Sequence, residues 1–190
     1  EETLELTAKA IDSFGKVNLI TVDNGSSTGG GYLRALSKIY IRNDSNLGYA
    51  RAVNQGLLLS QNNHVAIANN DIRLSPNWQD VAMDVLKRGR VFSCHLRMTD
   101  YDTPFEYGQQ VAVTGKERWC TGSFFVINRS RFRGMYDEKF LNSYDDWDYF
   151  MRIRETGLFT AYTDKACYQH HHSFTQQQIP EREENNTKNR

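Results

Sequence analysis

The stretch Val65–Leu74, VAIANNDIRL, decides the interpretation of this sequence. Its first four residues form a short apolar run, which is typical of a buried strand. Two amides and a carboxylate follow at once, Asn69, Asn70 and Asp71, without a glycine or proline that would mark a simple turn. A buried strand that ends in an acid indicates either a functional strand end or a side chain that caps the next segment.

Apolar runs and helical patterns alternate on both sides of this stretch. We expect helices over residues 1–14, 32–38, 47–60, 76–88 and 145–155, and strands over 17–22, 39–41, 64–68, 91–96, 120–128 and 159–162. The alternation of strand and helix predicts an α/β fold with a mixed, mainly parallel central sheet flanked by helices. Because such nucleotide-binding sheets usually open with a strand and this chain opens with a helix, we expect further sequence before Glu1.

Length and composition narrow the class of protein. A chain of 190 residues suits one domain with a sizeable core. Lysine plus arginine equals aspartate plus glutamate, 23 of each, so charge gives no case for a nucleic acid partner. No apolar run is long enough to span a membrane, and no signal peptide is visible. Three scattered cysteines predict a reducing, cytoplasmic location, either free or peripheral to a membrane, and the oligomeric state stays open.

Two of the predicted strands end in polar side chains. Asp23 and Asn24 follow the first strand, and Asn69 to Asp71 follow the third. Ligands of open parallel sheets bind outside the carboxyl ends of the strands, so neighbouring strands would bring Asp23 and Asp71 to one crevice. Oxygen ligands there suit Mg²⁺ or Mn²⁺, which takes the rest of its shell from water and a substrate phosphate. The alternative is that Asp71 caps the following segment.

A dense group of acids lies further along the chain. Five carboxylates fall within twelve residues, with one lysine among them: Asp137, Glu138, Asp145, Asp146 and Asp148. Such crowding costs repulsion unless a cation or a function offsets it. A carboxylate in a crevice can act as a general base. The alternative is that Asp145 and Asp146 only complement the dipole at a helix start.

Three consecutive histidines follow the last predicted strand. If this segment is extended, His170 and His172 share one face and His171 faces away. A neutral imidazole can complete a metal shell beside Asp71, whereas the alternative is a polar chain end. Residues 176–190 are polar and charged, which predicts a C-terminal tail outside the domain.

Six motifs in order carry a family resemblance. They are VDNGSS (22–27), NLGYARAVNQG (46–56), NND (69–71), CTGSFFVINRSRF (120–132), YDEKFLNSYDDWDYFMRIRETG (136–157) and HHHSFT (170–175). In this order they resemble the family-two glycosyltransferases, inverting nucleotide-sugar enzymes with the A-type (GT-A) fold. Within the family, the chain is most similar to rhamnosyltransferase-like enzymes that build surface polysaccharides. A phosphate-binding P-loop is not indicated, because GSSTGGGY (25–32) lacks the required lysine and Ser/Thr.

The resemblance implies a single Rossmann-like glycosyltransferase domain over residues 1–175. A donor-binding half would cover about 1–90, and an acceptor and catalytic half about 91–175. The implied reaction moves a hexosyl or rhamnosyl group from a UDP- or dTDP-sugar to a glycan or other hydroxyl acceptor. It inverts the anomeric carbon, and Mn²⁺ or Mg²⁺ assists. The alternative is a catalytically weak domain that only binds a glycan or nucleotide sugar.

The resemblance also assigns candidate roles to individual residues. Asp146 is the expected general base, and its neighbour Asp145 stands where the family commonly has glutamate, so either could contact the acceptor. The remaining candidates are Asp23, Asn24, Asn46, Gly48, Arg51, Asn69 and Asn70 for the donor, Gly122, Trp147 and Asp148 for the acceptor side, and Asp71, His170 and His172 for the metal. Asn24 and Gly48 could instead be turn formers, and Arg51 an ordinary exposed arginine.

Overall fold

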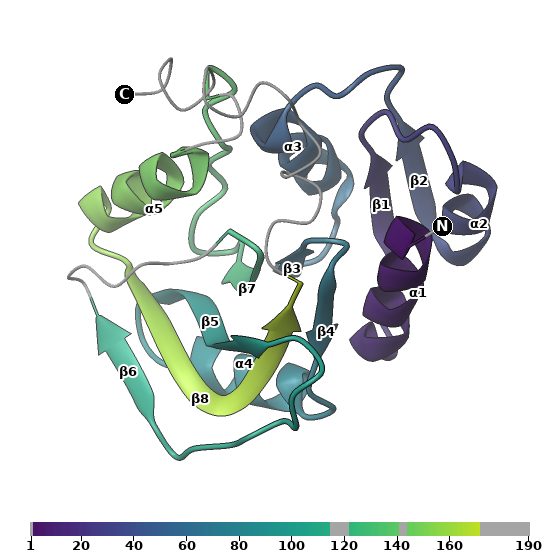
Figure 1. Ribbon diagram of the computed structural model, residues 1–190. Coiled ribbons are helices and arrows are strands. Elements are labelled where there is room, and N and C mark those ends of the chain that lie inside the picture. Colours follow the sequence, from purple (N-terminus) through teal and green to yellow (C-terminus); the bar gives the residue numbers. More distant parts are fainter. Residues whose placement is uncertain (1, 115–121, 141–143, 172–190) are drawn as a thin grey trace. The chain divides into compact units, whose positions relative to one another are not determined.

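A computed structural model describes residues 2–114, 122–140 and 144–171 (Figure 1). The chain divides into two compact units that are interleaved in the sequence. Among the described residues, unit 1 comprises 2–15, 62–114, 122–133 and 150–171, and unit 2 comprises 16–61, 134–140 and 144–149. None of the helices in these described ranges is long and apolar enough to cross a membrane.

Unit 2 is built on a β-α-β element. Strand β1 (Ile20–Asp23) pairs in parallel with β2 (Ile39–Arg42), and helix α2 (Gly30–Leu36) connects them. Helix α3 (Tyr49–Leu59) follows and packs against β1. Its buried residues, Ala50, Asn54 and Leu57, recur at helical spacing on one face, which explains why the predicted helix forms here.

Unit 1 is built on a six-stranded sheet. Its strands are β3 (His64–Ala68), β4 (Ile72–Leu74), β5 (Val91–Asp100), β6 (Val111–Thr114), β7 (Phe124–Asn128) and β8 (Phe159–His170). The order across the sheet is β3-β7-β5-β8-β4, and β6 pairs with β8 beside that path. Strand β8 bends sharply, and its pairing with β5 shifts register between Leu96 and Arg97 (Figure 1).

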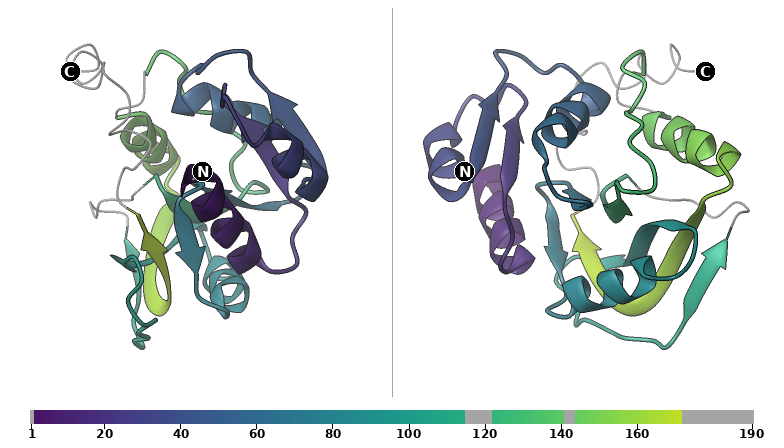
Figure 2. Two further views of the ribbon diagram at one scale, coloured as in Figure 1. Left: turned by 45° about the vertical axis from the view of Figure 1, so that its right-hand side comes forward. Right: turned by 180° about the vertical axis from the view of Figure 1, so that it is seen from behind.

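Three helices complete the fold. Helices α1 (Glu2–Phe14) and α4 (Trp78–Leu86) belong to unit 1, whereas α5 (Asp145–Glu155) begins in unit 2 and continues into unit 1. Seen from behind, α4 lies across the sheet of unit 1, where it packs on β5, β7 and β8 (Figure 2). Trp78 of this helix meets Phe124 edge to face at 5.5 Å, and Val91 and Cys94 beneath it are fully buried. Removal of this apolar surface from water stabilises unit 1.

The observed sheets confirm part of the predicted architecture. An α/β fold with a mixed sheet and flanking helices is confirmed. The prediction that the sheet is mainly parallel is wrong for the described strands. Only β1·β2 and β5·β8 are parallel among these described pairs, because β7 lies between β3 and β5 and runs against both. The strand before Asp23 pairs with β2 in unit 2, and the strand before Asp71 pairs with β7 in unit 1, so the predicted crevice shared by these two acids stays a prediction.

Candidate functional site

The turn between β3 and β4 holds Asn69, Asn70 and Asp71 in unit 1. The Asn69 backbone N–H donates to the Ser123 carbonyl at 2.8 Å, which ties the turn to the start of β7. The Asn70 side-chain amide donates to Thr7 Oγ1 of α1 at 3.2 Å. The Asn69 backbone and the Asn70 side chain therefore have structural partners, and these two contacts hold the turn from which Asp71 projects.

Asp71 and His170 lie side by side because β4 pairs with β8. The register places Ile72 opposite His170, and the His171 N–H donates to the Asp71 carbonyl at 3.0 Å. Asp71 Oδ1 lies 3.2 Å from His170 Nε2, and the side chains are only 6% and 12% exposed. Although these two atoms are close, Asp71 Oδ1 accepts no aligned hydrogen bond from the residues that the structure describes. A buried carboxylate oxygen and an imidazole nitrogen thus lie next to each other.

This pair fits a divalent cation that is shared with a substrate. Two ligand atoms about 2.1 Å from one ion at right angles would be about 3 Å apart, close to the observed separation. Among the described residues no group of three or more His, Cys, Asp or Glu could hold a metal, and His172 lies outside them. Mg²⁺ and similar ions commonly take only one or two protein ligands and complete their shell with water and phosphate.

The side chain of Asp23, at the end of β1 in unit 2, is fully enclosed by its own neighbours. Its Oδ2 accepts hydrogen bonds from Tyr40 Oη at 2.6 Å and Arg42 Nη1 at 2.5 Å, and its Oδ1 accepts one from the Ser26 N–H at 2.8 Å. Burial alone would raise the pKa of Asp23, but the hydrogen bonds and the Arg42 charge outweigh it and hold the pKa below its ordinary value. Asp23 is therefore an ionised, oriented anchor for the turn that follows.

Asn24 organises the loop that leads into α3. Its Oδ1 accepts hydrogen bonds from the Leu47 N–H and Asn43 Nδ2, and its Nδ2 donates to Asn46 Oδ1 at 2.8 Å. Asn46 Oδ1 also accepts the Gly48 N–H. Gly48 has a φ of 90°, in the region that favours glycine, just before α3 begins. Three predicted donor-binding residues, Asn24, Asn46 and Gly48, are thus brought together in unit 2.

Helix α3 is joined to the segment before α5 by polar contacts within unit 2. Asn54 Nδ2 donates to the Tyr136 carbonyl and to Glu138 Oε1, and Asn54 Oδ1 accepts the Tyr136 N–H. Arg51 Nε lies 3.4 Å from Glu138 Oε2, and both side chains are about half exposed. Sequence reasoning missed Asn54, and the available signal was an amide on the otherwise apolar stripe of α3.

The paired acids at the start of α5 differ in their surroundings. Asp145 is 6% exposed, and its Oδ1 accepts the Asp146 N–H at 3.0 Å. Its Oδ2 is buried and accepts no hydrogen bond from the residues that the structure describes. Burial, followed by the nearby charge of Asp146, raises the pKa of Asp145 to about 6. Asp146 is only partly buried, and its Oδ1 accepts the Trp147 N–H at 2.8 Å.

Aromatic rings enclose this helix start. Tyr136 stacks on Tyr149 with ring centroids 4.4 Å apart, and Tyr49 of α3 meets Tyr136 edge to face at 6.0 Å. Burial is the main reason why the pKa of Tyr136 lies well above its ordinary value, and the nearby Asp145 and Asp146 add to the shift. Tyr136, Tyr149 and Asp145 are all buried at this helix start.

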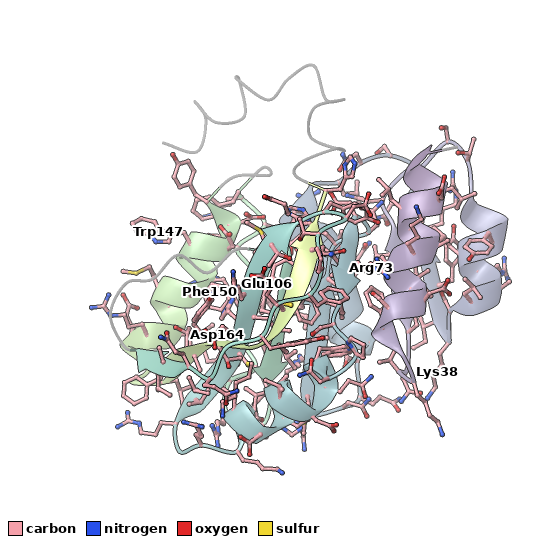
Figure 3. All side chains as sticks on the ribbon, turned by 60° about the horizontal axis from the view of Figure 1, so that its bottom comes forward. Lys38, Arg73, Glu106, Trp147, Phe150 and Asp164 are labelled. Atoms are coloured by element: carbon pink, nitrogen blue, oxygen red, sulfur yellow. The ribbon has the colours of Figure 1, made fainter. Side chains whose placement is uncertain are left out.

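The predicted acceptor-side residues occupy two places. Trp147 is 55% exposed and points outward from α5 (Figure 3), so its ring is available to stack on a sugar. The Asp148 N–H donates to the Tyr144 carbonyl in the first turn of the helix. Gly122 is partly buried just before β7 in unit 1. Asp71 belongs to unit 1, and Asp23 and Asp146 belong to unit 2, so their shared cleft stays a prediction.

Comparison with known families identifies the chain. The sequence model of "Glycosyl transferase family 2" matches residues 1–159. The chain belongs to this family. No curated protein sequence matches it at a significant level.

Solved structures of other glycosyltransferases share the fold. The crystal structure of S. aureus TarS 1-349 superposes with a TM-score of 0.69 at 11% identity, over 88% of this chain and 57% of that one. The same protein in complex with UDP gives 0.70 at 12% identity, over 88% and 56%. GalNAc-T7 with UDP, GalNAc and Mn²⁺ gives 0.64 at 13% identity, over 80% and 37%. The predicted GT-A fold is confirmed, and this chain spans a little over half of the TarS structures.

Proposed function

We propose that this protein transfers a sugar from a UDP- or dTDP-sugar to a hydroxyl of a glycan acceptor, with inversion at the anomeric carbon. Membership of glycosyl transferase family 2 supports sugar transfer. The similar TarS structure contains UDP, and the GalNAc-T7 structure contains UDP, GalNAc and Mn²⁺, which supports a nucleoside-diphosphate donor and a divalent cation. The transferred group is proposed to be a hexosyl or rhamnosyl residue.

The different burial of the two adjacent acids carries the assignment of the base. A general base must reach the acceptor hydroxyl, at hydrogen-bond distance. Asp145 is enclosed and already accepts the Asp146 N–H, whereas Asp146 remains partly exposed at the helix start. Asp146 is therefore the proposed base, and Asp145 is the positioning residue that orients the backbone of Asp146.

Asp71 and His170 are the proposed holders of a divalent cation, with His172 as a further candidate. The buried Asp71 oxygen and the adjacent imidazole nitrogen support this role. When bound, the cation would neutralise negative charge on the donor diphosphate. The chain's own contribution is the rigid placement of both ligands by the β4·β8 pairing, and of the turn itself by Asn69 and Asn70.

The donor is proposed to bind along the loops of unit 2. Asp23 is held ionised and oriented by Tyr40 and Arg42, so that it can anchor the turn that contacts the nucleotide. Asn24, Asn46 and Gly48 shape the adjacent loop, and Arg51 lies on the helix that follows it. On the acceptor side, Trp147 offers an exposed ring, with Asp148 and Gly122 as further candidates.

In the proposed reaction, Asp146 accepts the proton of the acceptor hydroxyl while that oxygen attacks the anomeric carbon. The bond from this carbon to the diphosphate oxygen breaks, and the nucleoside diphosphate leaves with the bonding electrons. One displacement from the opposite face inverts the configuration and needs no covalent intermediate.

Replacement of the proposed base provides the decisive experiment. Asp146→Asn keeps the size of the side chain but cannot take a proton, so turnover should fall about 10²–10⁴-fold. Donor affinity should hardly change, because the donor contacts are assigned to other residues. Asp84→Asn, an exposed site in α4, is the matched control and should retain full turnover.

Three results would contradict the proposal. Turnover of Asp146→Asn within about threefold of the parent, well below that range, would exclude Asp146 as the base. A product with retained anomeric configuration, measured by NMR, would exclude the single displacement. Binding of nucleotide sugars without any transfer or donor hydrolysis in the unmodified chain would match the alternative of a binding domain.

A further inference from the structure

Cationic side chains gather at one edge of the unit 1 sheet. Strands β5 and β8 run in parallel and begin together, with Val91 paired to Phe159. Strand β7 runs against β5 and ends at the same edge, where Asn128 leads into the next loop. Seven cations lie in the segments that meet there, and we name them the basic edge: Lys87, Arg88, Arg90, Arg129, Arg131, Arg133 and Arg154.

Direct contacts show that these segments touch. Arg131 Nη1 donates to the Arg88 carbonyl at 2.9 Å and also to the Val91 carbonyl, so the loop after β7 is fastened to the segment before β5. The Arg90 guanidinium lies over the Phe159 ring, 5.5 Å from its centroid. Arg90 Nη2 occupies the place that a Cβ at Gly157 would need, so Arg90 also packs closely on the α5–β8 connection.

Arg90 and Arg131 have structural roles in these contacts, and three other cations of the basic edge differ from them. Lys87, Arg88 and Arg133 are exposed. In the part of the chain that the structure describes, none of these three has a carboxylate within ion-pair distance. The segments 87–90, 129–133 and 154–158 contain one acid, Glu155, against the seven cations of the basic edge, so this edge carries a net positive charge although the whole chain carries equal numbers of acids and bases.

A purely structural explanation covers only part of the basic edge. Cations are favoured near a helix C-terminus because they complement its dipole. Helix α4 ends at Leu86, so Lys87 and Arg88 fit this explanation. The loop after β7 follows a strand, so its Arg133 is not itself part of a helix terminus.

We propose that the basic edge docks this protein onto a membrane surface that carries anionic phospholipids. Guanidinium groups match phosphate oxygens in a bidentate geometry, and several cations at one edge bind a surface that presents many phosphates. Each cation near an anionic membrane strengthens binding by about fivefold. The inference stands independently of the sugar-transfer chemistry.

The position of the basic edge favours a membrane over an anionic polymer that is itself the acceptor. Asp71 and His170 lie at the other end of the same sheet, after β3 and at the end of β8. The turn that holds Asp71 contacts Ser123 just before β7, and β7 runs from there to Asn128 at the basic edge. Cations that recognise an acceptor are expected beside the reacting groups. Cations at the opposite edge instead suit a docking surface that leaves the metal-ligand pair accessible.

Vesicle binding tests this inference with a matched pair of variants. The full chain is sedimented with phosphatidylcholine vesicles that contain or lack phosphatidylglycerol. Binding should require phosphatidylglycerol, weaken as salt rises, and fall roughly 30-fold in Arg88→Gln/Arg133→Gln, because two cations are lost. The control Lys16→Gln/Arg34→Gln loses the same charge at exposed positions of unit 2 and should bind like the parent. Circular dichroism and urea unfolding confirm that both variants are folded.

Several outcomes would overturn the inference. Binding that ignores phosphatidylglycerol would exclude anionic headgroups as the ligand. Equal losses in both double variants would show that overall charge, and not this edge, drives binding. If the parent binds soluble polyphosphate but not vesicles, and the Arg88/Arg133 variant loses that binding, the edge serves an anionic polymer instead.

Discussion

The buried acid at the start of α5 allows a quantitative prediction about pH and stability. Asp145 is 6% exposed, and its Oδ2 accepts no hydrogen bond from the described residues. In Asp145→Asn, the amide oxygen can still accept the Asp146 N–H that Oδ1 accepts now. The substitution thus removes the ionisable group while it keeps the shape of the side chain.

The direction of the effect follows from the pKa of Asp145. Burial and the Asp146 charge raise this pKa from its ordinary value of 3.8 to about 6 in the folded chain. Below about pH 3.8 the carboxyl is protonated in the folded and in the unfolded state, so it does not lower the free energy of unfolding. Between 3.8 and about 6 the folded state binds more protons than the unfolded state, so the free energy of unfolding falls as pH rises.

The magnitude follows from the same shift. About two pKa units at roughly 1.4 kcal/mol per unit correspond to a loss of about 3 kcal/mol, complete above pH 6. Asp145→Asn does not lose this free energy of unfolding, because its amide does not ionise. Relative to the parent, its free energy of unfolding should therefore rise by about 3 kcal/mol between about pH 3 and pH 8.

Urea unfolding of both proteins across this pH range measures the difference directly. Because the comparison is between two proteins at each pH, contributions from groups that do not interact with Asp145 cancel. Asp146→Asn is a second, partial variant: it removes the second cause of the raised pKa, so its pH-dependent loss should be smaller than in the parent. A difference between Asp145→Asn and the parent that stays constant with pH would refute the burial argument.

Two further predictions concern unit 1. Asp71→Ala should abolish the Mn²⁺-dependent part of the thermal stabilisation by UDP while the fold survives, and an unchanged metal dependence would exclude Asp71 as a ligand. His95 is buried, stacks on Phe125 with centroids 5.3 Å apart, and has its pKa lowered by burial from 6.5 to about 3. The stability that depends on the neutral form of His95 is complete above pH 6.5 and is lost as pH falls toward 3. His95→Gln should therefore lose less free energy of unfolding in acid than the parent does. Urea unfolding of both proteins measures this difference. If the free energy of unfolding falls equally with pH in the two proteins, this role of His95 is contradicted.

Local pattern in the sequence determined most of the elements. Strand β3 and helix α5 have the predicted limits, because the period of apolar residues reports directly which face of a segment is buried. Strands β4 and β6 were not predicted, since three or four residues are too few to show a period. The ordered motifs also identified the family, which the match over residues 1–159 confirms.

Tertiary structure alone decided which residues meet. His170 lies beside Asp71 because β8 continues past the predicted end of the strand at residue 162 and pairs with β4. Asp145 and Asp146 are equivalent acids in the sequence, and only the folded structure makes Asp145 buried and leaves Asp146 partly exposed. Sequence periodicity is a property of neighbours along the chain, whereas pairing and burial depend on segments that are distant along it.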